Sequence, residues 1–203
     1  HGRVLHPHQF VAHYMRNGHT YNGNVPEDAI LEAQWIDLRE RLKVEMPALG
    51  KMVPLVDVSG SMSGTPMEVA VALGVLISEI GVIKDRFLTF SSEPAWHNMQ
   101  GIPTLQKKVA SALSADWGGS TDLVKALRLI LKACVEGEVP PEEVGALSLV
   151  VLSDMQFDQA QGNCLAYYNN SITLPKWEPQ HETLQRLFAQ AGLRTKYKEP
   201  YPV

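Results

Sequence analysis

The chain has 203 residues, of which 45% are hydrophobic and 20% charged, and its formal net charge is −4. This length can bury the core of one domain with an additional arm, and the composition is that of an ordinary globular protein. The slight negative charge argues against nucleic acid as a partner, because phosphate-binding surfaces are usually basic, and no apolar run is long enough to span a bilayer. Cys134 and Cys164 form no CxxC pair, so we interpret them as reduced thiols of a cytoplasmic protein.

Residues 1–48 predict a helical arm that packs on the rest of the chain. A short helix is expected within residues 4–15, after Pro7. Apolar side chains recur at helical spacing within residues 28–45, which predicts a longer helix that ends before Pro47. These side chains are Ile30, Ala33, Trp35, Leu38 and Leu42. We expect Trp35 and Leu38 to pack against the following domain instead of forming a separate one.

Residues 49–203 alternate between apolar runs typical of buried strands and patterns typical of helices. Strands are predicted at residues 52–58, 86–90 and 146–152, with a short edge strand at residues 95–99. One strongly apolar helix is predicted to begin with Thr65 as its N-cap, with Glu68 completing a capping box. Further helices are predicted at residues 104–114, 122–137 and 181–191, and a loop or insertion at residues 159–180.

This alternation predicts an α/β fold with a doubly wound, mostly parallel sheet and helices on both faces. The strand at 52–58 should lie beside the strand at 147–152. No convincing apolar strand follows the last predicted helix, so one or two strands at one side of the sheet are expected to be missing. The strand at 146–152 would then lie near an edge, where unpaired backbone groups favour unwanted pairing.

Three oxygen-rich loops fall where such sheets bind ligands, beyond the carboxyl ends of the strands. The first follows the strand at 52–58, the second precedes the helix at 122, and the third follows the strand at 146–152. Their candidate metal ligands are Asp57, Ser59, Ser61, Thr121 and Asp154. Hydroxyl and carboxylate oxygens suit Mg²⁺, Mn²⁺ or Ca²⁺ and not Zn²⁺. This set leaves a coordination position that a carboxylate from a partner can fill.

The pattern D-x-S-x-S, followed by a later Thr and a later Asp, resembles the metal-ion-dependent adhesion site of von Willebrand factor A-type domains, which have a Rossmann-type fold. The resemblance implies that Ser59, Ser61 and Thr121 contact the metal. It also implies that Asp57 and Asp154 act directly or through water.

A narrower resemblance covers most of the chain. The segments LHPHQF, EAQWIDL, DVSGSMSGTPMEVAVALG, WGGSTD and VLSDMQFDQA look like successive blocks of an uncharacterised eukaryotic and giant-virus family of intracellular proteins with a C-terminal A-type domain. This resemblance implies the same fold and an intracellular location, and it adds no biochemical function.

The favoured prediction is a divalent-metal-dependent interaction module, not an enzyme, that binds an Asp or Glu carboxylate of a protein ligand. One alternative is a phosphohydrolase that uses the metal as a Lewis acid. Against it, Ser59 stands where aspartyl phosphatases have a second Asp, and the motif loops contain no His or Lys to act as a base. A scaffold domain of a ribonucleoprotein is a further alternative, by analogy alone. A zinc site at His6 and His8 is disfavoured, because no Cys or further His follows at finger spacing.

Overall fold

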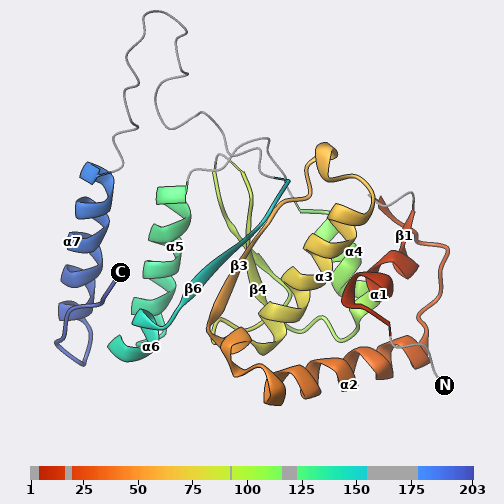
Figure 1. Ribbon diagram of the computed structural model, residues 1–203, viewed down its shortest axis with the longest axis horizontal. Coiled ribbons are helices and arrows are strands. Elements are labelled where there is room, and N and C mark those ends of the chain that lie inside the picture. Colours follow the sequence, from red (N-terminus) through yellow and green to blue (C-terminus); the bar gives the residue numbers. More distant parts are fainter. Residues whose placement is uncertain (1–4, 17–19, 92, 116–122, 155–177) are drawn as a thin grey trace, which may run out of the picture.

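The computed structural model describes residues 5–16, 20–91, 93–115, 123–154 and 178–203 (Figure 1). They form a mixed α/β structure around a four-stranded, open and mostly parallel sheet with the strand order β5-β4-β3-β6. The strands are β3 (Met52–Val56), β4 (Arg86–Thr89), β5 (Trp96–Asn98) and β6 (Ser148–Leu152). The strand β3 pairs in parallel with both β4 and β6, whereas β5 pairs antiparallel with β4.

The predicted pairing of the first and last strands of the domain is confirmed. Five consecutive residue pairs join β3 to β6, from Met52 opposite Ser148 to Val56 opposite Leu152. Within the described residues β5 and β6 are the two edges of the sheet, and residues 195–203 contain no strand, as the sequence indicates. The strand β6 is only half-buried beyond Ser148, which fits its place at an edge.

Helices cover both faces of the sheet, with a separate apolar core on each (Figure 1). One face carries α1 (Pro7–Tyr14), α3 (Thr65–Ile80) and α4 (Leu105–Leu113). The other carries α5 (Leu123–Glu136), α6 (Pro141–Gly145) and α7 (Glu178–Arg194). Side chains of β3 alternate between the two cores: Val56 belongs to the first, and Val53 and Leu55 to the second. None of the helices in the described ranges is long and apolar enough to cross a membrane.

The start of α3 differs from the prediction. The N-cap is Gly64 with φ of 92°, a left-handed conformation that suits glycine, and Thr65 is the first helical residue. The predicted capping box between Thr65 and Glu68 was therefore wrong. The helix thus begins one residue earlier than predicted, and Pro66 is its second residue. Proline is tolerated there because backbone N–H groups of the first helical turn have no intrahelical partner.

Several short or peripheral elements also differ from the prediction. Pro141 opens the short helix α6, which was not predicted, and α7 begins at Glu178, ahead of the predicted residue 181. The sequence also did not predict the two-stranded ribbon of β1 (Met15–Arg16) and β2 (Thr20–Tyr21). The predicted oxygen-rich loop before the helix at 122, with Thr121, and most of the predicted loop at 159–180 lie outside the described residues.

The N-terminal arm forms part of the core of the domain. The helix α2 (Ala29–Glu45) runs along the edge of the molecule opposite the carboxyl ends of β3 and β6 (Figure 1). Trp35 and Leu38, which were expected to pack against the domain, are 2% and 8% exposed. Trp35 Nε1 donates a hydrogen bond to Glu79 of α3 at 3.0 Å. The carboxylate of Glu32 accepts hydrogen bonds from the backbone N–H groups of Leu105 and Gln106, and so caps α4.

A half-buried histidine lies on the edge strand β5. The His97 ring stacks on Phe87 with ring centroids 4.8 Å apart, and its Nε2 lies 2.9 Å from Ser111 Oγ. Burial lowers the pKa of His97 below its ordinary value of 6.5, because the charged imidazolium loses hydration.

We expect the free energy of unfolding to fall as the pH is lowered through about 6.5, where the unfolded chain binds a proton that folded His97 takes up only at lower pH. The substitution His97→Gln keeps a hydrogen-bonding group near Ser111 but does not titrate, so it should reduce this loss. Urea unfolding at about pH 8 and about pH 5.5 measures the difference. Equal losses in both proteins would show that His97 is not the responsible group.

Candidate metal site at the carboxyl ends of the strands

The candidate site lies where the direction of sheet winding reverses. The chain passes from β3 outward to β4 and β5, and then returns to the other side of β3 as β6. Two backbone hydrogen bonds continue the pairing one residue past the strands, from Phe90 N to Val56 O and from Asp57 N to Leu152 O, each 2.9 Å long. Asp57 therefore lies at a topological switch point, where open α/β sheets bind their ligands.

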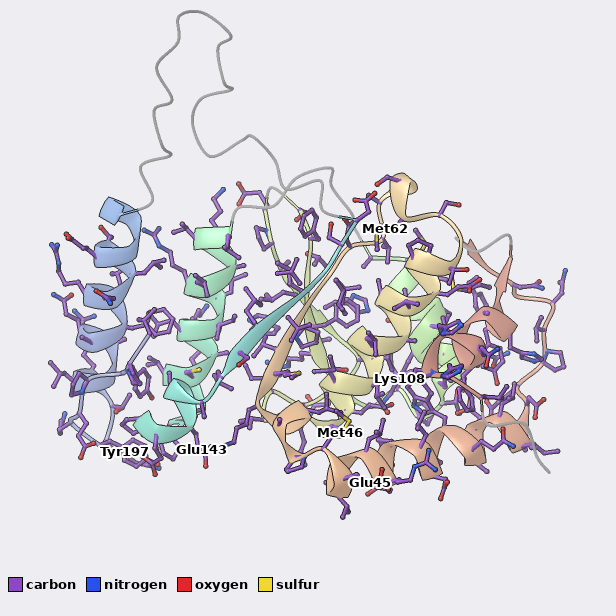
Figure 2. The ribbon with its side chains drawn as sticks, viewed as in Figure 1. Glu45, Met46, Met62, Lys108, Glu143 and Tyr197 are labelled. Atoms are coloured by element: carbon purple, nitrogen blue, oxygen red, sulfur yellow. The ribbon has the colours of Figure 1, made fainter. Side chains whose placement is uncertain are left out.

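The loop after β3 holds Ser59 and Ser61 in a tight turn. The backbone N–H of Ser59 donates to Asp57 Oδ1 at 2.8 Å, an Asx-type turn that reverses the chain. Residues Gly60–Met62 then form one 3₁₀ turn. Met62 (labelled in Figure 2) is 3% exposed and is part of the core beside α3, so it anchors the turn. Ser61 is exposed.

The spacing of the two serine hydroxyls fits a small octahedral cation. Ser59 Oγ and Ser61 Oγ lie 3.0 Å apart. Neighbouring oxygens of an octahedral Mg²⁺ site, each about 2.0–2.1 Å from the ion, are about 2.8–3.0 Å apart. The longer Ca²⁺ distances of about 2.3–2.6 Å would give about 3.3–3.7 Å in the same geometry. The two hydroxyls can thus serve as neighbouring Mg²⁺ ligands without moving, although the same distance also allows a hydrogen bond between them.

The second oxygen of the Asp57 carboxylate is held from the neighbouring strand. Ser153 Oγ donates a hydrogen bond to Asp57 Oδ2 at 2.8 Å. Ser153 was not among the predicted site residues. The available signal was the parallel pairing itself: with residue 56 opposite residue 152, the next pair along the ladder is 57 and 153.

The charge of Asp57 has no cationic partner in the described part of the chain. Asp57 is 2% exposed, and its carboxylate takes part in none of the ion pairs formed between described residues. Glu79, whose side chain is 5% exposed, is by contrast paired with Lys108 at 2.7 Å. A buried carboxylate held only by neutral donors costs several kcal/mol, which a nearby cation would offset.

Of the two remaining predicted ligands, the structure describes only Asp154. Asp154 follows Ser153 directly and is exposed at the end of β6. Thr121 lies outside the described residues. The structure therefore brings together Asp57, Ser59 and Ser61 of the predicted set, and adds Ser153.

Acidic, histidine and cysteine side chains alone do not form a metal site in the described ranges, where no three of them cluster suitably. An ion at the strand ends would depend on hydroxyl oxygens, which is the chemistry of Mg²⁺ and not of Zn²⁺.

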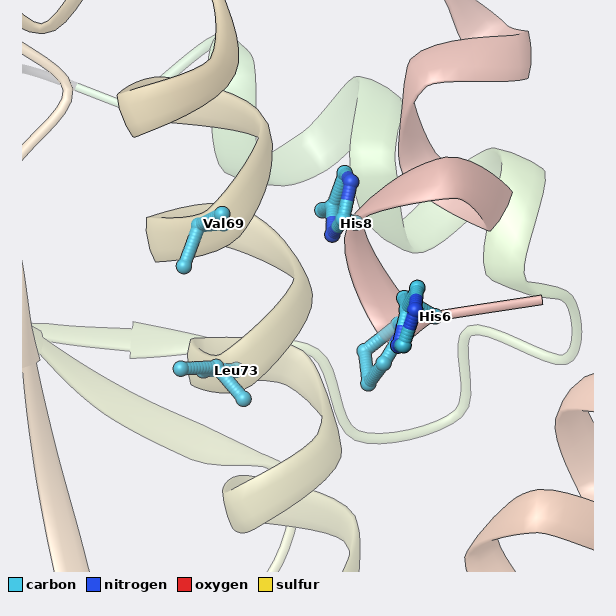
Figure 3. A pocket seen from close by; sticks show the side chains of 5 residues that line it. His6, His8, Val69 and Leu73 are labelled. Atoms are coloured by element: carbon cyan, nitrogen blue, oxygen red, sulfur yellow. The ribbon is translucent and has the colours of Figure 1, made fainter.

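His6 and His8 stack with ring centroids 5.9 Å apart beside Val69 and Leu73 of α3, and they line a surface pocket (Figure 3). No third ligand joins these two histidines within the described residues, so the disfavoured zinc alternative gains no support.

The fold and site define a mixed α/β protein with a group of carboxylate and hydroxyl side chains at the ends of an open, mostly parallel sheet. The chain belongs to the family described as a domain of unknown function (DUF7788), whose model matches residues 51–199. It is also 32% identical over 190 residues to an uncharacterized protein of Acanthamoeba polyphaga mimivirus. That alignment covers 93% of this chain, hence most of the N-terminal arm, but only 29% of the length of the viral protein. No solved structure matches the chain.

Proposed function

We propose that this chain is a divalent-metal-dependent protein-interaction module with a von Willebrand factor A-like, Rossmann-type fold. Ser59, Ser61 and Thr121 would contact Mg²⁺, or Mn²⁺ or Ca²⁺ in its place, with Asp57 and Asp154 acting directly or through water. The observation that carries the proposal is the buried Asp57 carboxylate, which lacks a cationic partner in the described ranges and lies beside two hydroxyls at Mg²⁺-ligand spacing.

The character of these ligands supports binding of an external carboxylate. The hydroxyls are neutral, and Asp57 already accepts a hydrogen bond at each carboxylate oxygen. Few negative charges would therefore contact the ion directly, and its positive charge would remain available to an Asp or Glu of a protein partner. In this proposal the residues bind and orient, and none is assigned a catalytic role.

The strand order and the helices on both faces support the doubly wound part of the proposal. A cytoplasmic location is also proposed. It is supported by Cys134, a free and fully buried thiol whose pKa is raised to about 11 by burial.

Titration of Mn²⁺ into the full chain, followed by calorimetry, tests the metal site. We expect one ion to bind, and Ser61→Ala to weaken binding at least about tenfold, or about 1.4 kcal/mol, because it removes a ligand from an exposed turn without removing core volume. Ser114→Ala, which removes an exposed hydroxyl at the end of α4, is the control and should bind as the wild type does. Absence of binding by the wild type, or equal binding by Ser61→Ala, would contradict the proposal.

A further inference from the structure

The carboxylate of Asp57 is held from two separate segments of the chain. Its Oδ1 accepts from Ser59 N in its own loop, and its Oδ2 accepts from Ser153 Oγ beyond the end of β6, each at 2.8 Å. Each oxygen is therefore fixed by a different donor, and the plane of the carboxylate cannot rotate without breaking one of these hydrogen bonds.

From this arrangement we infer that Ser153 is a positioning residue of the metal site, which fixes the orientation of Asp57 without contacting the ion itself. The inference rests on the proposed function. It assigns a specific role to a side chain that the D-x-S-x-S pattern, Thr121 and Asp154 do not include.

Attachment of β6 to the sheet does not need the Ser153 hydroxyl. Five residue pairs of parallel ladder already join β6 to β3, and the hydrogen bond from Asp57 N to Leu152 O extends them to the site. Removing the hydroxyl should leave the sheet intact and leave Asp57 Oδ2, in a residue that is 2% exposed, without this hydrogen bond. The principal consequence is then a less well-oriented Asp57, and the loss should appear in metal affinity more than in folding.

The expected size of the effect follows from the usual behaviour of groups that orient metal ligands. Loss of such a hydrogen-bonding partner typically weakens metal binding about 10–100-fold. Ser153→Ala should therefore bind Mn²⁺ at least about tenfold more weakly than the wild type.

A pair of variants with the same shape separates the hydroxyl from the packing. Thr and Val are both β-branched and both suit a position at a strand end, but only Thr retains the hydroxyl. Mn²⁺ is titrated by calorimetry into the full chain carrying Ser153→Ala, Ser153→Thr or Ser153→Val, and each metal-free protein is also melted. Ser148→Ala, at the opposite and exposed end of β6, is the matched control.

We expect Ser153→Thr and Ser148→Ala to bind Mn²⁺ close to the wild-type affinity, and Ser153→Val to be weakened as Ser153→Ala is, with similar melting temperatures for all. If Ser153→Ala fails to fold, the Mn²⁺ affinities of Ser153→Thr and Ser153→Val decide whether the hydroxyl is required. If Ser153→Val binds Mn²⁺ with the wild-type affinity, or if Ser153→Thr and Ser153→Val weaken Mn²⁺ binding equally, the proposed role of Ser153 is overturned. Neither result would contradict the metal site itself. A wild-type chain that binds no Mn²⁺ would overturn both this inference and the proposed function.

Discussion

Deletion of residues 1–46 should leave a chain that does not fold cooperatively. The deleted segment supplies six apolar side chains to the core beside α3, and each is at most 8% exposed: Phe10, Val11, Tyr14, Met15, Trp35 and Leu38. Burial of such side chains contributes about 1.5–3 kcal/mol each, so the set contributes about 9–18 kcal/mol. That is comparable to the whole stability of a typical domain, about 5–15 kcal/mol. The shortened chain should show no sigmoidal thermal transition and should bind a dye specific for exposed apolar surface.

Two point substitutions give the same test at single positions. Trp35→Ala should lower the free energy of unfolding by about 3–5 kcal/mol, because it removes a large buried ring and leaves Glu79 without the hydrogen bond from the indole. Ile30→Ala, on the same helix but 71% exposed, should change stability by less than about 0.5 kcal/mol. A shortened chain that melts cooperatively at the wild-type temperature would show that the arm is dispensable, despite its place in the core.

The sheet could be predicted from sequence because the signals that specify it are local. The apolar runs that became β3 and β6 are short and bounded by polar turns. Their position side by side was expected because the oxygen-rich loops that follow them must meet to form one site. The role of Glu32 could not be predicted in the same way. Its carboxylate caps α4 through Leu105 N, 73 positions along the chain, and nothing in the local sequence around either residue marks that contact.

The candidate site was predicted in part for the same reason. Asp57, Ser59 and Ser61 lie within one turn, so their convergence follows from the spacing of the motif. The contribution of Ser153 depends on strand register, which a sequence pattern does not specify until the two strands are known to pair. The backbone conformation before α3 was also not predicted. The N-cap is Gly64, which has a left-handed φ, whereas the side chains of Thr65 and Glu68 indicated an N-cap one residue later.

The substitution Asp57→Asn should abolish metal binding without destabilising the metal-free protein. Asn has nearly the same shape, its side-chain oxygen can accept from Ser59 N, and its amide can donate to Ser153 Oγ, since a hydroxyl rotates to act as donor or acceptor. The change removes a buried negative charge that has only neutral partners among the described residues, so the metal-free variant should be at least as stable as the wild type.

Thermal unfolding with and without Mn²⁺ shows both effects at once. At about 100 times its dissociation constant, a bound ion stabilises the folded state by about 2.7 kcal/mol, which raises the melting temperature of a chain of this size by about 5–11 °C. We expect this increase for the wild type and for the control Asp37→Asn, an exposed acid on α2, and no increase for Asp57→Asn. An equal increase in Asp57→Asn would place the ion elsewhere on the molecule. A metal-free Asp57→Asn protein that melts well below the wild type would show that the Asp57 charge stabilises the fold without any cation, and the argument from its missing partner would then fail.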